Sequence, residues 1–172
     1  MIKEEETINP VVYNKNIFLD IGGVIATSQS FWKISAEKQD LLEMILEKTN
    51  AKIVVSSNWR RDTLQSTIKY LNRCGFRFCN KIVGITSNII CHYTEENGYL
   101  SFSRGAEIKQ WIISNVGEDW KQKISNGKWN YVILDDGSDM LAEQKNNFIQ
   151  TDSFEGLTIE HVNKAIEILH EI

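Results

Sequence analysis

The chain has 172 residues, of which 42% are hydrophobic, and this length and composition suffice for one domain with a sizeable core. Its formal net charge of −4 gives no overall attraction to nucleic acid or anionic lipid, so a phosphate-bearing ligand has to be bound by a local group of cations. No apolar stretch is long enough to span a membrane, and the polar N-terminus (MIKEEETINP) is unlike a signal peptide, so we expect a cytoplasmic protein with no membrane partner.

Short apolar runs rich in β-branched residues are expected to form five buried strands. In chain order they span residues 16–20, 52–57, 81–86, 130–135 and 147–151. We expect residues 1–15 to be a flexible tail and residues 16–172 to form the domain.

Helical patterns separate these strands. The residues expected to open them are Ser35, Asp62, Ser103 and Thr158. Asp62 and Gln65 resemble a capping box, and Gly75 is expected to end that second helix. The alternation of strand and helix predicts an α/β domain with a Rossmann-like parallel sheet, covered by helices on both faces.

Polar residues follow the predicted strands at their carboxyl ends. Asp20 ends the first strand, Ser56 and Ser57 end the second, and Asp135 and Asp136 end the fourth. Because the carboxyl ends of parallel strands share one edge, we expect these side chains to converge. Asp20 alone would be interpreted as a turn residue, but acidic and hydroxyl groups at three strand ends favour a site for Mg²⁺ and phosphate.

The two glycines after Asp20 fit the same interpretation. Gly22 and Gly23 allow the backbone to turn sharply and to approach a ligand closely. An aspartate held beside a cation stays ionised and can attack phosphorus, which gives an aspartyl-phosphate that water later cleaves. Ser56 would hold a phosphoryl oxygen, and a basic side chain would neutralise the charge of the phosphoryl group in transit.

Several segments together resemble a known family. FLDIGGV, IVVSSNWR and YVILDDGSDM, with a basic residue before the last, resemble the four motifs of the haloacid-dehalogenase-like (HAD) phosphohydrolases. More narrowly, SSNWR, VGIT, SRGAEIKQWI, YVILDDGSDM and FIQTDSFEGLT resemble the HAD domain associated with swiss-army-knife RNA-repair proteins. The resemblance runs from about Asn16 to the C-terminus and implies a Rossmann-like, HAD-like fold of three layers.

The resemblance also implies roles for individual residues. It implies that Asp20 is the nucleophile and a metal ligand, and that Ser56 binds the phosphoryl group. It further implies that Asp135 binds Mg²⁺, that Asp136 supports the ion, and that the main-chain carbonyl of Gly22 is another ligand.

The basic residue of the third motif has two candidates. Arg104 in SRGAEI is the first and Lys109 is the second. Further residues expected to contact the substrate are Gly22, Gly23, Ser57, Asn58 and Arg60. Arg60 could instead be a solvent-exposed residue at the start of a helix, with no contact to a ligand.

One position departs from the family pattern. Typical phosphatases of this family have an aspartate two residues after the nucleophile, which protonates the leaving oxygen, whereas this chain has Gly22. Such acid–base assistance is typically worth about 10² to 10⁴ in rate, so turnover should be weakened unless Asp136 transfers the proton.

Three functions remain open at this point. The first is Mg²⁺-dependent hydrolysis of a phosphomonoester, including a phosphate at a nucleic-acid end. The second is a catalytically degenerate domain that binds a phosphorylated partner without turnover, and the third is phosphoryl transfer to an alcohol. The sequence does not indicate an oligomeric state.

The remaining predictions concern aromatic residues and a cap. Trp59, beside Asn58 and Arg60, is a candidate platform for a base, whereas Trp111 is expected in the core. The stretch 76–102 is too short for a large cap domain, and residues 93–100 are expected to form a small hairpin or loop over the site.

Overall fold

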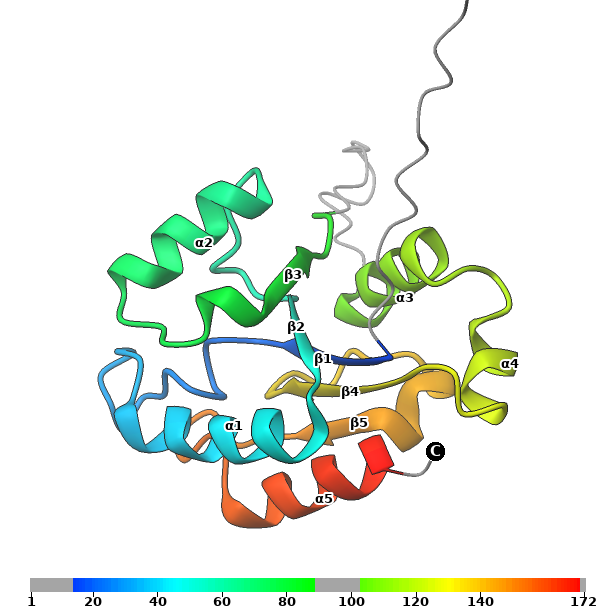
Figure 1. Cartoon of the computed structure of the whole chain (residues 1–172). Helices are drawn as coiled ribbons and strands as arrows, with labels where there is room; N and C mark the ends of the chain where they lie inside the picture. The colour runs from blue at the N-terminus through cyan, green and yellow to red at the C-terminus, as the bar shows by residue number, and fades with distance from the viewer. Residues whose placement is uncertain (1–13, 89–102, 171–172) are drawn as a thin grey trace, which may run out of the picture.

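A five-stranded parallel sheet forms the centre of the molecule (Figure 1). The computed structural model describes residues 14–88 and 103–170. The strands are β1 (Lys15–Leu19), β2 (Lys52–Val55), β3 (Ile82–Ile85), β4 (Asn130–Asp135) and β5 (Phe148–Gln150), in the spatial order β3-β2-β1-β4-β5. Each of the predicted strands is present, and the Rossmann-like α/β fold is confirmed. The predicted tail, except for its last two residues, and the predicted hairpin lie outside the described residues.

The described part of the chain also has five α-helices and two 3₁₀ turns, and all of them except the last helix lie between strands. They are α1 (Ala36–Thr49), α2 (Leu64–Arg73), η1 (Cys79–Lys81), α3 (Arg104–Asn115), α4 (Trp120–Ser125), η2 (Ala142–Asn147) and α5 (Ile159–His170). None of the helices in the ranges 14–88 and 103–170 is long and apolar enough to cross a membrane. α4 was not expected from the sequence, because six residues are too few to produce a clear helical period.

The predicted helix starts are confirmed except for the second. Ser35 and Ser103 cap α1 and α3 by accepting hydrogen bonds from backbone amides. The cap of α2 is Thr63 and not Asp62, because Thr63 and Ser66 exchange reciprocal hydrogen bonds of 3.1 Å between hydroxyl and backbone amide. A threonine hydroxyl placed one residue later therefore provides the capping box that Asp62 and Gln65 were expected to provide.

The helices form one layer on each face of the sheet. α1, α2 and α5 pack on the face to which Ile17 and Leu19 point, while α3 and α4 pack on the face of Phe18. All three of these β1 side chains are fully buried, which explains why the strand is a continuous apolar run without polar alternation. In Figure 1, α1 and α5 lie side by side below the sheet and α3 lies above it.

The strand register brings the carboxyl ends of the central strands to one edge. The amide of Asp20 donates to the carbonyl of Leu134 at 2.9 Å, and the amide of Ser56 donates to the carbonyl of Leu19 at 3.0 Å. The first polar residue after β1 therefore lies beside the end of β4, and the first polar residue after β2 lies beside the end of β1, as the parallel arrangement requires.

Candidate functional site

Three carboxylates meet at the carboxyl edge of the sheet. One oxygen each from Asp20, Asp135 and Asp136 lies within 4.8 Å of the others. Asp20 and Asp135 are only 9% and 3% exposed, because each directly follows or ends a strand that is buried on both faces. Three acidic groups this close, two of them shielded from water, repel one another strongly unless a cation or a proton lies between them.

Asp20 is held in a fixed orientation by its neighbours. Its Oδ1 accepts a hydrogen bond of 2.7 Å from the amide of Ile21, and Ser57 donates a side-chain hydrogen bond to the carboxylate. Burial raises the pKa of Asp20 above its ordinary value, and the bond from Ser57 and the positive charge of Arg104 oppose this rise.

Asp135 has one oxygen satisfied and one without a hydrogen-bond partner. Its Oδ1 accepts from the amide of Gly137 at 2.8 Å, while the buried Oδ2 has no hydrogen bond among the described residues. The guanidinium of Arg104 forms an ion pair with this oxygen, with 3.6 Å between Arg104 Nε and Asp135 Oδ2. Burial, followed by the negative charge of Asp20, raises the pKa of Asp135 to about 7.

These residues fit a divalent cation such as Mg²⁺. The ligand atoms are hard carboxylate oxygens, which this ion prefers, and Asp135 Oδ2 is a buried acceptor that lacks a donor. A cation between the carboxylates would offset the repulsion that raises the pKa values of Asp20 and Asp135.

The turn after β1 needs glycine at position 23. Gly23 has a φ of +76°, and a Cβ at this position would lie 2.2 Å from the carboxyl group of Asp136. The carbonyl of Gly23 accepts a hydrogen bond of 2.8 Å from the hydroxyl of Thr151, which follows β5. The absence of a side chain therefore allows the backbone of the turn to contact the acidic cluster.

Ser56 provides a second buried polar atom without a partner. The residue is fully buried where β2 ends, and its Oγ has no hydrogen bond within the ranges 14–88 and 103–170. Buried hydroxyls almost always have a partner, so this one is available for a ligand oxygen or a water molecule.

Two arginines near the cluster share one carboxylate. Glu107 Oε2 lies 3.2 Å from Arg60 Nη2 and 3.2 Å from Arg104 Nη1. Arg60 also donates to the hydroxyl of Thr86 at 2.6 Å and to Asn88, which ties the end of β2 to the end of β3. Burial lowers the pKa of the Arg60 guanidinium, and the charge of Glu107 opposes this effect.

The position of Arg104 follows from how α3 begins. The amide of Arg104 donates to Asp139 at 2.8 Å, and Gln144 donates to the carbonyl of Gly105 at 2.8 Å. A Cβ on Gly105 would lie 2.5 Å from the amide nitrogen of Leu141, so only glycine allows this close contact between α3 and the loop after β4. The contact directs the Arg104 guanidinium toward Asp135.

The sequence was also compared with models of known protein families, and the result agrees with the observed fold and polar cluster. The family described as the HAD domain in Swiss Army Knife RNA repair proteins matches residues 16–162. The chain belongs to this family. No curated protein and no solved structure matches the chain.

Most of the predicted site residues of this HAD domain lie together. The side chains of Asp20, Ser57, Arg104, Asp135 and Asp136 are linked by the contacts described above.

Two of the other predicted contact residues lie beside this group. Asn58 accepts a hydrogen bond of 3.0 Å from Arg104. Arg60 is buried and bonded internally, so the alternative of a solvated helix start is wrong for it, whereas its Nε has no partner among the described residues.

Lys109 lies elsewhere. Its Nζ forms an ion pair of 2.7 Å with Glu143, and Lys121 contacts the same carboxylate at 2.6 Å. The Lys109 side chain is 41% exposed, whereas that of Arg104 is 12% exposed. Of the two candidates for the basic residue, Arg104 is the one that contacts the acidic cluster.

Two indole rings border Gly22. A Cβ built on this glycine would lie 3.7 Å from Trp59 Nε1 and 4.0 Å from Trp32 Cζ3, which are ordinary van der Waals distances. The Trp59 ring also packs against Tyr70 at 6.2 Å. There is therefore room for a small side chain at position 22, although the family aspartate is missing here.

Sequence reasoning missed Glu107 and Thr86. Glu107 is 8% exposed on the buried face of α3, next to Ile108, and a carboxylate within an apolar helix face was the available signal. Thr86 follows β3 as the serines follow β2, so the same strand-end rule could have identified it.

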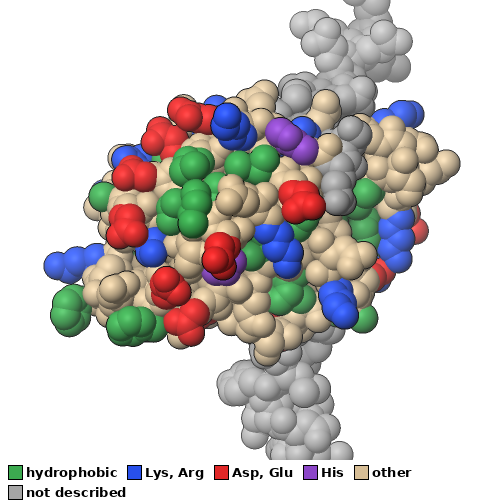
Figure 2. All heavy atoms as spheres, turned by 90° about the horizontal axis from the view of Figure 1, so that it is seen from below, with side chains coloured by type: hydrophobic (Ala, Val, Ile, Leu, Met, Phe, Trp, Pro, Cys, Tyr) green, Lys and Arg blue, Asp and Glu red, His purple; other side chains and the backbone are tan. Residues whose placement is uncertain are grey.

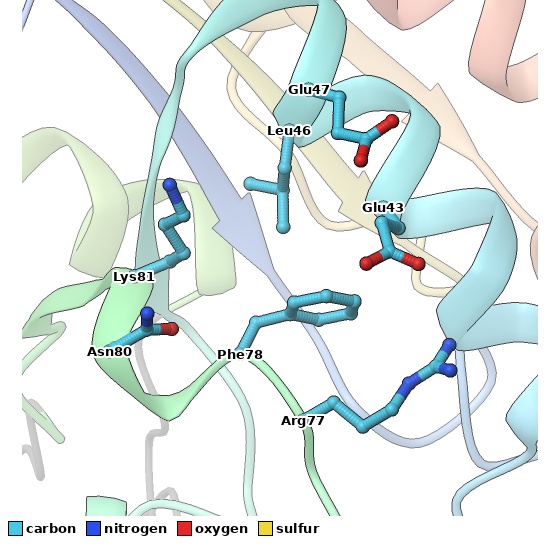
Figure 3. A pocket seen from close by; sticks show the side chains of 7 residues that line it. All are labelled: Glu43, Leu46, Glu47, Arg77, Phe78, Asn80 and Lys81. Atoms are coloured by element: carbon cyan, nitrogen blue, oxygen red, sulfur yellow. The ribbon is translucent and has the colours of Figure 1, made fainter.

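A separate hollow of about 370 Å³ lies beside α1 (Figure 3). Its lining residues are Glu43, Leu46, Glu47, Arg77, Phe78, Asn80 and Lys81. None of the predicted site residues lines it.

Proposed function

We propose that this HAD domain is a Mg²⁺-dependent phosphomonoester hydrolase that uses Asp20 as its nucleophile. The observation that carries the proposal is the convergence of three carboxylates and Arg104 at one buried edge of the sheet. Membership in a HAD family supports phosphatase-like chemistry in general, and the substrate and the metal are part of the proposal.

In the first step, an oxygen of the ionised Asp20 carboxylate attacks the phosphorus atom. The new oxygen–phosphorus bond forms as the bond to the leaving oxygen breaks, which leaves an aspartyl-phosphate. The hydrogen bonds from Ile21 and Ser57 hold Asp20 in one orientation, so little reorganisation precedes the attack. In the second step, water cleaves the acyl phosphate and releases inorganic phosphate.

Asp20 and Asp135, with the carbonyl of Gly22, would hold the Mg²⁺ ion, and Asp136 would support it without binding it directly. When bound, the ion supplies positive charge for the phosphate oxygens. Arg104 adds positive charge from the protein itself, and Glu107 holds its guanidinium on the side of the cluster. Ser56 Oγ, which lacks a partner, is available to donate to a phosphoryl oxygen.

Position 22 is a glycine, so it has no side chain that could donate a proton to the leaving oxygen. Asp136 is the half-buried carboxyl of the cluster, and we assign it the proton transfer that the family aspartate performs elsewhere. Because it is not placed two residues after the nucleophile, we expect turnover below that of a typical family member, by up to about 10² to 10⁴.

The proposed substrate is a phosphate at the end of a nucleic acid. The family description refers to RNA repair proteins, and a terminal phosphomonoester is the group in such substrates that this chemistry acts on.

A specific observation favours a second candidate, which is a domain that binds a phosphorylated partner without turnover. The missing carboxylate at Gly22 removes acid–base assistance and leaves the binding groups intact. This candidate uses the same metal and phosphate contacts but no chemical step.

Phosphate release from p-nitrophenyl phosphate and from a phosphorylated oligonucleotide separates the two candidates. We expect the wild type to release phosphate with Mg²⁺ but not with EDTA, and Asp20→Asn to abolish release. Asp40→Asn, which changes an exposed carboxylate on α1, is the matched control and should retain full activity.

Gly22→Asp is the decisive further variant, because its Cβ fits between the two indoles. No release by the wild type together with clear release by Gly22→Asp would establish the binding-only candidate. Analysis of products in the presence of an alcohol would detect phosphoryl transfer in place of hydrolysis.

A further inference from the structure

Two neighbouring aromatic side chains in the loop between β1 and α1 project into solvent. Phe31 is 86% exposed and Trp32 is 51% exposed. Contact of large aromatic rings with water is unfavourable, and neighbouring exposed apolar side chains can mark a site of interaction.

The backbone of this loop is also unusual. Phe31 and Trp32 have φ values of +52° and +57°, a left-handed conformation that bulky residues rarely adopt. Hydrogen bonds hold it: the amide of Trp32 donates to the carbonyl of Thr27 at 2.7 Å, and Ser30 Oγ donates to the carbonyl of Lys33 at 2.6 Å. The loop therefore maintains a strained backbone that keeps both rings in water.

The loop lies against the candidate active site. Trp32 Cζ3 is 4.0 Å from the Cβ position of Gly22, which is two residues from the nucleophile Asp20. On the other side of Gly22 is Trp59 Nε1, at 3.7 Å from the same point. A half-exposed indole therefore lies beside the glycine that is two residues from the proposed nucleophile.

We propose that Trp32 is a stacking platform for the base of the terminal nucleotide whose phosphate is bound at Asp20. The inference rests on the proposed function and adds to it the part of the substrate that lies beyond the phosphate. An indole face binds any base by stacking, so the platform would select nucleotide ends over simple phosphate esters without reading sequence. Phe31, the adjacent exposed ring, extends the same apolar surface.

The test compares two substrates with the same protein. One is a short single-stranded RNA with a terminal phosphate, at the 3′ end in one series and the 5′ end in another. The other is glycerol phosphate, which has no ring. The measured quantity is the ratio of kcat/KM for the RNA to kcat/KM for glycerol phosphate.

We expect Trp32→Ala to lower this ratio by roughly tenfold or more, mainly through KM for the RNA, as the loss of a base-stacking contact does. Trp32→Phe should restore most of it, because an aromatic face remains. Met44→Ala is the control, since Met44 is an apolar side chain 40% exposed on α1 and should leave the ratio unchanged. An unchanged ratio for Trp32→Ala, or equal losses for both substrates, would overturn the stacking role.

A binding measurement separates failure of the inference from failure of the proposed function. If the wild type hydrolyses neither substrate, fluorescence anisotropy of the labelled phosphorylated RNA decides the inference alone. Binding that weakens roughly tenfold in Trp32→Ala supports the platform. No binding to the wild type, or equal binding by both proteins, removes it. Binding of a second protein through Phe31 and Trp32, with no effect on RNA, would also exclude the platform.

Discussion

Two regions of the molecule gather charged side chains, and water reaches them very differently. At the edge of the sheet, the side chains of Arg60 and Glu107 are 2% and 10% exposed. Beside α1, the ion pair of Arg77 and Asp40 has side chains 42% and 65% exposed, although a hollow of about 370 Å³ adjoins it. Figure 2 shows the α1 and α5 face from outside, with acidic and basic side chains distributed around a small hydrophobic group.

This difference separates a chemical site from an ordinary charged surface. Buried charges are costly, and they persist where they are paired or where they serve a ligand. The edge of the sheet combines a high charge density with buried polar atoms that have no partner in the described part of the chain, namely Ser56 Oγ, Arg60 Nε and Asp135 Oδ2. The hollow beside α1 also has charged lining residues, but none of its described lining residues has a buried polar atom without a partner.

The largest expected effect is on kcat/KM, when the buried Arg104 and the solvated Lys109 are each replaced by alanine. Arg104→Ala should lower kcat/KM for a phosphate ester by roughly 10² to 10³, since it removes a preorganised charge at the phosphate. Lys109→Ala should change it by less than about twofold, because Lys109 is bound to Glu143 at the surface. Steady-state kinetics of both variants test this, and the reverse order of effects would assign the third motif to Lys109.

The acidic cluster should make stability depend on pH when no metal is bound. The pKa of Asp135 is raised to about 7 from 3.8, so between these values the folded protein holds a proton that the unfolded chain releases. The free energy of unfolding therefore falls as the pH rises from about 4 to about 7, by up to about 4 kcal/mol.

Thermal unfolding in EDTA at pH 5.5 and pH 8 measures this effect. Asp135→Asn should remove most of the difference, and addition of Mg²⁺ should restore stability at pH 8, where the carboxylates are ionised. A wild type that is more stable in EDTA at pH 8 than at pH 5.5 would contradict the assignment.

The two ion pairs should differ in their contribution to stability. Glu107→Gln leaves Arg60 and Arg104 without their shared carboxylate and should lower the free energy of unfolding by roughly 3 kcal/mol. Asp40→Asn should lower it by less than about 1 kcal/mol, because its ion pair is solvated. Urea unfolding curves for the two variants provide the comparison, and equal losses would show that burial does not distinguish the regions.

The smallest effect is expected at Ser56. Its hydroxyl makes no hydrogen bond in the described structure, so Ser56→Ala should change the free energy of unfolding by less than about 1 kcal/mol. The same change should weaken phosphate binding several-fold, by roughly 1 kcal/mol, which isothermal titration with inorganic phosphate and Mg²⁺ can measure. Loss of stability without loss of binding would indicate a structural hydroxyl.

The fold was predictable from the sequence because its elements are locally encoded. The buried strands are continuous apolar runs, and Ser35 and Ser103 mark their helices by a capping hydroxyl. The acidic cluster was predictable for a related reason, since the strand-end rule needs only the strand boundaries and a parallel sheet.

The rest of the site depends on tertiary contacts that have no local pattern. The helix face of Glu107 was a signal in the sequence, but its partner Arg60 is 47 residues away in the chain and became identifiable only when α3 packed beside β2. The choice between Arg104 and Lys109 likewise depended on how Gly105 packs against the loop after β4. Trp32 belongs to no recognisable motif and to no helical pattern in the sequence. Its position beside Gly22 depends on a left-handed backbone conformation that tryptophan rarely adopts.

The shared carboxylate of Glu107 has a consequence for the order in which ligands enter. Among the described residues of the site, four carboxyl groups (Asp20, Asp135, Asp136 and Glu107) outnumber the two guanidinium groups of Arg60 and Arg104, so the local charge is negative once Asp135 has lost its proton. An incoming phosphate dianion is repelled by this balance, whereas a dication is attracted and cancels it. We therefore expect the metal to enter first, and inorganic phosphate to protect the fold against heat only after Mg²⁺ has been added.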